Sequence, residues 1–238
     1  MIFTQMQFRN IFITICFLIF CNVTYAQADH RLGEWNVLII KGKIAPRFTM
    51  VGESNMRNSA RDFNYNYFEI KGGISYAFNK NISGLVGSGF YNTYTSGGLF
   101  LAPAVQNEIR TWLELDIKHA YKRLNFEHRL RIEQRFIPEN YKNRFRYKLG
   151  LNLPVNNSLF TKGTLYFALY NEFFISQQEP FLSKNRFFAG GGYKITGNTT
   201  FQVGCINDTD YLPNTYSVKN YLQLILIYDF TKLINKHA

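Results

Sequence analysis

The sequence predicts an all-β protein, an antiparallel up-and-down transmembrane β-barrel of ten to twelve strands. Three observations favour this class: an apolar leader, an alternation of apolar and polar residues with period two, and strand-like segments of which many have 11–16 residues. Strands of soluble proteins average about 5–6 residues, whereas a strand that crosses a bilayer needs about 9–11. The long segments therefore favour a membrane barrel over a soluble sheet protein.

The leader is an apolar run of 11 residues from Ile11 to Cys21. It is too short to span a bilayer as a helix, but it has the length of a signal-peptide core. Small residues follow, so we expect cleavage after Ala26 or after Ala28. The predicted organisation is a signal peptide over residues 1–26 and a single barrel domain over 27–238, located in the outer membrane of a Gram-negative cell. An uncleaved N-terminal anchor is the alternative.

The composition excludes several classes of protein. The 238 residues are 17% aromatic, which argues against disorder, and no apolar run is long enough for a helical membrane protein. Removal of the leader leaves Cys205 as the last of three cysteines, so an internal disulfide is excluded. We expect Cys205 to act as a small apolar residue on a strand.

Eleven segments are predicted as strands: Glu34–Ile40, Ile44–Asn55, Tyr65–Phe78, Ile82–Tyr94, Ala104–His119, Arg123–Phe136, Lys142–Leu153, Thr161–Ile175, Asn185–Ile195, Thr200–Asn207 and Tyr216–Phe230. Bacterial single-chain barrels have even strand numbers. Either the Trp35 segment therefore lies outside the wall, which leaves ten strands, or a twelfth strand goes undetected.

The predicted connections alternate in length, as they do in outer-membrane barrels. Short turns are expected at 79–81, 120–122 and 196–199, and an intermediate connection at 154–160. Longer polar loops are expected at 56–64, 95–103, 137–141, 176–184 and 208–215.

The last strand carries Leu222, Leu224, Leu226, Tyr228 and Phe230 on one face, with Ile225 and Ile227 as apolar exceptions on the other. It resembles the C-terminal strand of bacterial outer-membrane barrels, which tends to end in an aromatic residue. An eight-residue tail follows Phe230. We expect interfacial aromatic girdles built from Phe68, Tyr76, Phe78, Phe136, Phe174 and Tyr228, the alternative being the core of a soluble protein.

Charged residues recur at every second position in two neighbouring segments, so they share one face of each strand. An Arg or Lys facing lipid costs about 2–4 kcal/mol at the midplane, so these faces must point into the lumen. The predicted network is Glu108, Arg110, Glu114, Glu127, Arg129, Arg131, Glu133, Arg135, Arg144, Arg146, Glu172 and Arg186.

A hairpin that turns at Tyr121–Lys122 places Glu114 opposite Arg129 and Arg110 opposite Glu133. Opposite charges favour this register, although it also opposes Asp116 to Glu127. Two interpretations of the network stay open. It either fills the lumen as an ionic plug or forms a cationic constriction that selects small anionic solutes.

Catalytic and cofactor chemistry is not indicated. His119 and His128 fall on the predicted lipid-facing side, and His30 and His237 lie near the chain ends. Gly190, Gly191 and Gly192 lie mid-strand, where they permit curvature or close packing. Asn207, Asp208 and Asp210 are interpreted as an ordinary polar turn, with a calcium loop as the weaker alternative. We expect no cofactor and no metal.

The expected partners are outer-membrane lipids and lipopolysaccharide, whose anionic head groups suit the net charge of +11, and the barrel-assembly machinery. Small anionic solutes are a further candidate, whereas nucleic acid is not expected because Lys and Arg are spread over lumen faces and loops. An outer-membrane enzyme acting on lipid or surface polymer and a soluble periplasmic binding module are the alternative functions.

Several motifs carry a resemblance to a known family. They are Glu108-x-Arg110-x-Trp112, the run from His128 to Phe136, Asn143 to Tyr147, Asn171 to Phe174, and Asn185-Arg186. The chain from Trp35 to Phe230 resembles a domain-of-unknown-function family of predicted outer-membrane β-barrels in Bacteroidetes-like bacteria. The resemblance implies the same fold and no established activity.

Overall fold

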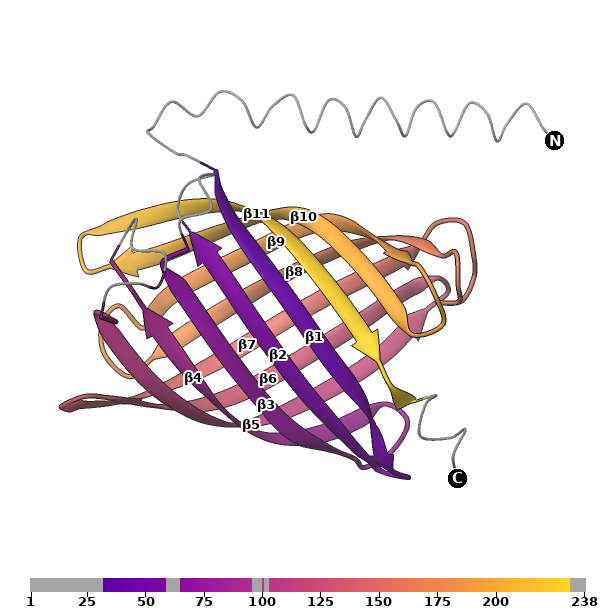
Figure 1. Cartoon of the computed structure of the whole chain (residues 1–238), viewed down its shortest axis with the longest axis horizontal. Coiled ribbons are helices and arrows are strands. Elements are labelled where there is room, and N and C mark those ends of the chain that lie inside the picture. Colours follow the sequence, from indigo (N-terminus) through magenta and orange to yellow (C-terminus); the bar gives the residue numbers. More distant parts are fainter. Residues whose placement is uncertain (1–31, 59–64, 96–99, 101–102, 232–238) are drawn as a thin grey trace. The chain divides into compact units, whose positions relative to one another are not determined.

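The chain folds into a closed barrel of eleven strands in a computed structural model that describes residues 32–58, 65–95, 100 and 103–231 (Figure 1). The predicted signal peptide, His30 and His237 lie outside these residues. The strands are β1 (Gly33–Ala45), β2 (Phe48–Asn58), β3 (Tyr67–Ala77), β4 (Ile82–Thr93), β5 (Gln106–Tyr121), β6 (Leu124–Ile137), β7 (Asn140–Pro154), β8 (Leu165–Ser176), β9 (Leu182–Lys194), β10 (Thr199–Leu212) and β11 (Thr215–Asp229).

Sequential strands pair antiparallel, but the barrel closes through a parallel pair, β1 with β11. The prediction of a barrel with ten to twelve strands is confirmed, whereas a wholly antiparallel sheet is wrong. Both explanations offered for the odd number of predicted strands are wrong as well. The Trp35 segment is a full strand of the wall, and no twelfth strand occurs among the described residues. Parallel closure allows an odd strand number, since the first and last strands then run in the same direction.

Because β1 and β11 run in the same direction, the start of β1 and the finish of β11 lie at opposite ends of the barrel. β1 begins at the end that we call the N-terminal end, and β11 finishes at the other, the C-terminal end (Figure 1). The seam continues past β11, where the Phe230 amide donates to the Lys41 carbonyl at 2.8 Å.

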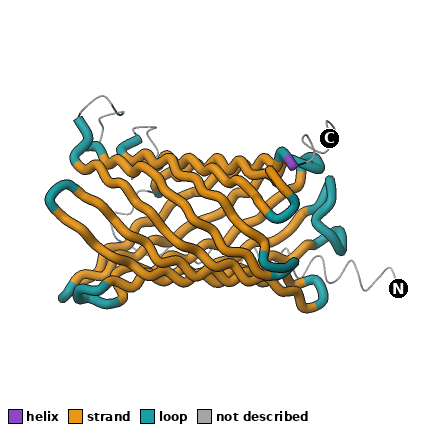
Figure 2. Tube along the Cα trace, turned by 90° about the horizontal axis from the view of Figure 1, so that it is seen from below, coloured by secondary structure: helices purple, strands orange, loops and turns teal. Residues whose placement is uncertain are grey.

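The connections follow the predicted alternation only in part (Figure 2). The C-terminal end has turns at 46–47, 78–81, 122–123 and 195–198, and a longer connection at 155–164. The N-terminal end has connections at 59–66, 94–105 and 177–181. The prediction of longer loops at 137–141 and 208–215 is wrong. The pairing of β6 with β7 extends to Ile137↔Asn140, and that of β10 with β11 extends to Leu212↔Thr215, so each connection is a two-residue turn.

The outer face of the wall is apolar and exposed. Val86, Phe90, Leu113 and Ile132 point outward and are 58–63% exposed, and Cys205 also lies on this face of β10. The one predicted girdle residue that points inward is Phe174, which is 2% exposed, because it shares a face with Glu172. Among the described residues, no helix has the length and apolarity to cross a membrane.

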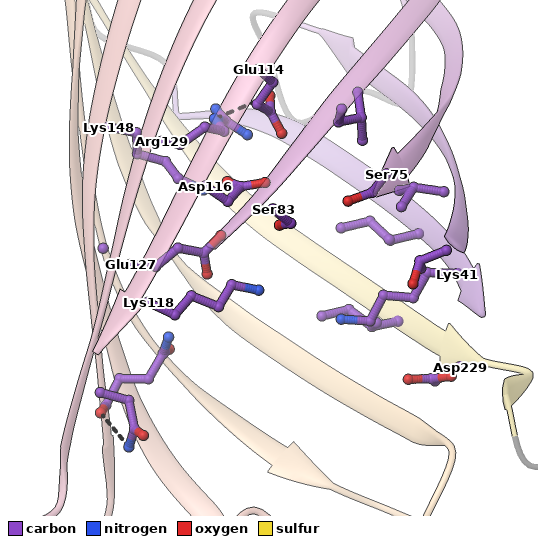
Figure 3. Close-up of a pocket in the computed structure, with 18 of the residues that line it drawn as sticks. Lys41, Ser75, Ser83, Glu114, Asp116, Lys118, Glu127, Arg129, Lys148 and Asp229 are labelled. Carbon is purple, nitrogen blue, oxygen red and sulfur yellow. Dashed lines mark hydrogen bonds and ion pairs between the residues drawn. The ribbon is translucent and has the colours of Figure 1, made fainter. Parts of the chain in front are cut away.

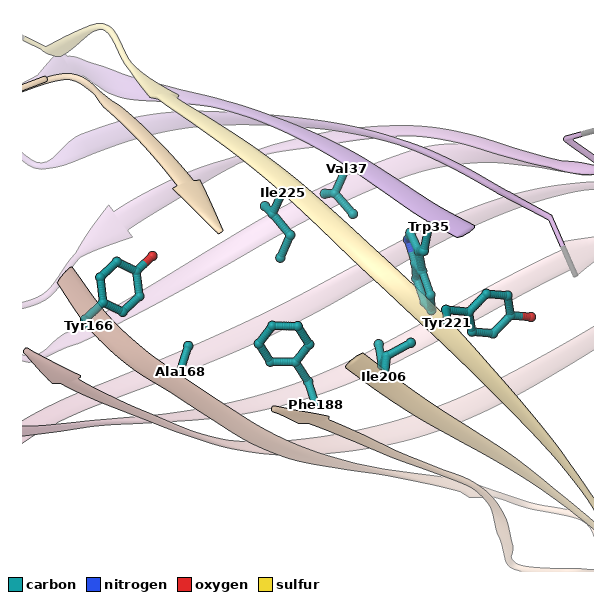
Figure 4. Close-up of a cluster of buried hydrophobic side chains, with 8 residues drawn as sticks. All are labelled: Trp35, Val37, Tyr166, Ala168, Phe188, Ile206, Tyr221 and Ile225. Atoms are coloured by element: carbon teal, nitrogen blue, oxygen red, sulfur yellow. The ribbon is translucent and has the colours of Figure 1, made fainter. Parts of the chain in front are cut away.

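An apolar cluster occupies one side of the lumen (Figure 4). It consists of Trp35, Val37, Tyr166, Ala168, Phe188, Ile206, Tyr221 and Ile225, from β1 and β8–β11. Ile227 packs against it, so the two exceptions on the last strand, Ile225 and Ile227, are lumen residues of this cluster.

Glycines allow the large rings of the cluster to approach the wall. A Cβ at Gly192 would lie 2.1 Å from the Tyr166 ring, and one at Gly190 would lie 2.3 Å from the Val203 carbonyl oxygen. The expectation of close packing is therefore confirmed for Gly190 and Gly192, whereas a Cβ at Gly191 would meet only the Tyr166 carbonyl oxygen at 3.6 Å.

Candidate functional site: a charged lumen with a cavity

The β5–β6 hairpin sets the register of the charged strands, and the predicted register is off by two residues. The turn lies at 122–123, so Tyr121 pairs with Leu124, and Glu114 faces Arg131 while Asp116 faces Arg129. Lys122 has a φ of 53°, the left-handed conformation that a two-residue hairpin turn requires. In this register Asp116 faces Arg129 and Glu127 faces Lys118, so the two carboxylates are not directly opposed.

Glu133 of β6 is the most enclosed carboxylate of the network, at 0% exposure. Arg146 donates to it at 3.0 Å and Arg144 at 2.5 Å, both from β7. Arg110 of β5 lies 3.8 Å away. Three guanidinium groups thus surround one carboxylate.

Two further carboxylates extend this cluster along the wall. Glu172 of β8 accepts from Arg146 at 2.8 Å and from Arg129 at 2.7 Å. Glu108 of β5 accepts from Arg110 at 2.7 Å and from Arg135. Arg110 and Arg135 face each other in the register, and the carboxylate of Glu108 between them offsets their repulsion.

The remaining predicted residues lie at the two margins of this cluster. Glu114 accepts from Arg131 Nε at 2.6 Å. Arg186 donates to Asp208, and its Nη1 lies 4.0 Å from Glu172. Glu127 stands apart, because it makes no ion pair within 4 Å in the part of the chain that the structure describes.

Asp208 is a lumen residue that the sequence pattern did not reveal. The interpretation of 207–210 as a polar turn is wrong, since these residues lie inside β10. Asp208 is 1% exposed and binds Arg186 at 2.9 Å and Lys184 at 3.0 Å. The alternation Lys184-x-Arg186 opposite Asp208-x-Asp210 is the signal that could have found it.

A second missed group lies on β2 and β3. Lys71 contacts Glu69 at 2.6 Å and Glu53 at 2.9 Å. Asn55 donates to Glu69 at 2.8 Å and accepts from Trp35 Nε1 at 2.7 Å. These contacts connect the charged residues to the apolar cluster.

Arginine side chains also stack on lumen aromatics. Arg57 and Arg186 lie 4.5 and 4.6 Å from the Trp35 ring, and Arg146 lies 4.5 Å from Phe174. Such contacts stabilise a guanidinium that has lost water. These charged residues and rings come from β1–β3 and β5–β10 and lie toward the N-terminal end of the lumen. We call this layer of charges and rings the plug.

The C-terminal half of the lumen holds a cavity of about 1090 Å³ (Figure 3). Arg131 and Trp112 belong to its inner boundary, and Lys41, Lys118 and Lys148 line its walls. Asp116, Glu127 and Asp229 also face it.

The two described histidines lie on the outer face near the C-terminal end. Their rings stack 5.2 Å apart, and His128 Nδ1 lies 2.9 Å from the Tyr147 hydroxyl. His119 also stacks on Phe126 at 4.8 Å. Both histidines therefore pack among aromatic side chains of the outer wall.

A protein-family model matches residues 32–219, which include ten complete strands and the start of β11. The chain belongs to DUF2490, a family described as protein of unknown function. The DUF2490 match covers every charged residue of the plug and confirms the expected membership of an uncharacterised family. No curated protein matches the sequence.

Proposed function

We propose that this DUF2490 protein is an outer-membrane β-barrel of Bacteroidetes-like bacteria, with a structural role and a lumen that the plug closes. Lipids and lipopolysaccharide surround its outer face, and the barrel-assembly machinery inserts it. The narrow-pore alternative differs only in leaving a path for ions through the plug.

The observation that carries the proposal is the distribution of side chains across the wall. Exposed Leu, Ile, Val and Phe cover the outside, whereas the charges point inward. A soluble barrel has the opposite distribution, because water must meet its outer face. A bilayer favours an apolar outer band around a polar interior.

The pairing within the plug favours closure over conduction. Glu108, Glu133, Glu172 and Asp208 are at most 4% exposed, and each holds at least two cations. A conducting constriction needs charges that remain free to exchange a solute. Here the counter-charges are other side chains of the wall.

Membrane location is tested by fractionation. The chain should remain with outer membranes after a carbonate wash and should migrate faster in gels when it is not boiled. Recovery in the soluble periplasm without detergent, with one mobility in both samples, would instead support the soluble binding module.

Closure is tested by conductance in planar bilayers. Protein that is reconstituted into the bilayer, and whose folded state is verified by its unboiled gel mobility, should give no discrete current steps. Reproducible steps with a fixed unit conductance would contradict the plug and support the narrow pore. The described histidines contact only rings and a tyrosine hydroxyl, so no observation favours the enzyme.

A further inference from the structure

The cavity in the C-terminal half of the lumen has the size and the charge of a solute-binding site. Its volume is about 1090 Å³, which is at the upper end of the range of small-molecule pockets. Nine Lys or Arg residues and five carboxylates line it, an excess of four positive charges. A ligand for this cavity is therefore expected to be an anion.

Three lysines of the cavity differ from the cations of the plug. Lys41, Lys118 and Lys148 make no ion pair within 4 Å in the described part of the chain, whereas the arginines of the plug each hold a carboxylate. Lys41 of β1 and Lys118 of β5 extend toward each other from opposite walls (Figure 3). Their ammonium groups remain available to a ligand that lies between them.

The carboxylates of the cavity restrict the ligand further. Asp116, Glu127 and Asp229 face the cavity. An acceptor beside the lysines suits a ligand that carries a hydroxyl as well as an anionic group.

We propose that this cavity binds a small oxyanion that also carries a hydroxyl group, of the chemistry found in a glycerol phosphate. Lys41, Lys118 and Lys148 neutralise the anion, and a carboxylate of the cavity wall (Asp116, Glu127 or Asp229) accepts from its hydroxyl. The proposal goes beyond the barrel function and does not rest on the membrane location, because binding is measurable in detergent.

The test is titration calorimetry of the full chain in detergent at low salt, with glycerol phosphate as the probe and neutral glycerol as the blank. Glycerol phosphate should bind, with an affinity that falls as salt is added because mobile ions screen the cavity charges. The triple variant Lys41→Gln, Lys118→Gln and Lys148→Gln should bind at least about tenfold more weakly. Equal binding by wild type and the triple variant would overturn the proposal.

The control variant loses the same charge outside the cavity. Lys142→Gln, Lys162→Gln and Lys219→Gln change three lysines that do not line it, and binding should stay within about twofold of wild type. Unboiled gel mobility verifies that both triple variants are folded. A loss of binding equal to that of the cavity variant would show a general charge effect and would overturn the site.

The same phosphate chemistry has two sources, which a second titration separates. Binding of soluble glycerol phosphate identifies a free solute. Binding only of phosphatidylglycerol added in mixed detergent micelles, lost in the cavity variant, identifies a lipid head group. If neither probe binds at concentrations up to about 10 mM, the proposal is overturned. That result would leave the proposed membrane location untouched.

Discussion

Arg146 Nη1 donates a hydrogen bond to Glu133 Oε2 at 3.0 Å, between the adjacent strands β7 and β6. Neither side chain is more than 9% exposed, so the pair is shielded from water inside the lumen. Removing one partner of such a pair leaves an uncompensated buried charge. The ion pair is therefore a stability element of the plug, and it provides the first prediction.

Glu133→Gln should destabilise the barrel by about 3–5 kcal/mol, because Arg110, Arg144 and Arg146 lose their shared counter-charge. Urea unfolding in detergent, followed by the loss of unboiled gel mobility, measures the change. Glu139→Gln in the exposed turn at 138–139 is the matched control and should shift stability by less than about 0.5 kcal/mol. Equal shifts in the two variants would argue against the role of Glu133.

Phe187 and Phe188 are neighbours in sequence on opposite faces of β9. Phe188 is 0% exposed in the lumen cluster, whereas Phe187 is 46% exposed on the outer face. Phe188→Ala should cost about 3–5 kcal/mol through the cavity it leaves, and Phe187→Ala should cost clearly less. The same urea assay compares them, and a larger effect at Phe187 would reverse the assignment of the faces.

The register of the β5–β6 hairpin is testable by cross-linking in a Cys205→Ser background. Leu113→Cys with Ile132→Cys places the two thiols on directly paired outward positions, about 4.5–5.5 Å apart at Cβ. This pair should form a disulfide on mild oxidation. Leu113→Cys with Leu130→Cys represents the register that the charge pattern predicted, and its preferential cross-linking would contradict the structure.

The parallel seam is testable in the same background. Leu38→Cys and Leu226→Cys are paired outward positions of β1 and β11 and should cross-link in the native barrel. Leu38→Cys with Leu222→Cys lies four residues out of register and should not. Efficient cross-linking of the second pair, with none of the first, would mean that the barrel closes differently.

Period-two alternation predicted which face of most strands is charged. Glu127, Arg129, Arg131, Glu133 and Arg135 share a face because the pleat places every second side chain on one side. The exception among the expected outward rings was Phe174, although it lies two residues after Glu172 and so belongs to the same inward face. The alternation was sufficient there, and its strict application would have placed Phe174 in the lumen.

The sequence indicates the register of the β5–β6 hairpin less clearly than it indicates the faces of the strands. No Asn-Gly or Asp-Gly pair marks the β5–β6 turn, and Lys122 adopts a positive φ without a sequence signal for it. The one register that the opposite charges predicted, with Glu114 opposite Arg129, is wrong, because Glu114 also finds an opposite charge in Arg131. In the observed register Glu108 satisfies both Arg110 and Arg135 from a neighbouring position, a contact that direct pairing does not include.

The closure was beyond the reach of local patterns. Alternation defines the faces of a strand but not the direction of its neighbour, so the parallel pair of β1 and β11 was not foreseen. For the same reason Ile225 and Ile227 looked like exceptions. Their apolar partners Trp35 and Val37 are about 190 residues away in the sequence and become neighbours only when the barrel closes.

The most direct test of the central claim, that the wall spans a membrane, labels both ends of β6. Lys122 precedes this strand at the C-terminal end, and Glu139 follows it at the N-terminal end. In the Cys205→Ser background, Lys122→Cys and Glu139→Cys are treated with a membrane-impermeant maleimide in intact cells and again after the outer membrane is permeabilised. We predict that one site reacts in intact cells and the other only after permeabilisation. Equal reaction of both sites in intact cells, or reaction of neither site until the membrane is permeabilised, would contradict a barrel that spans the outer membrane.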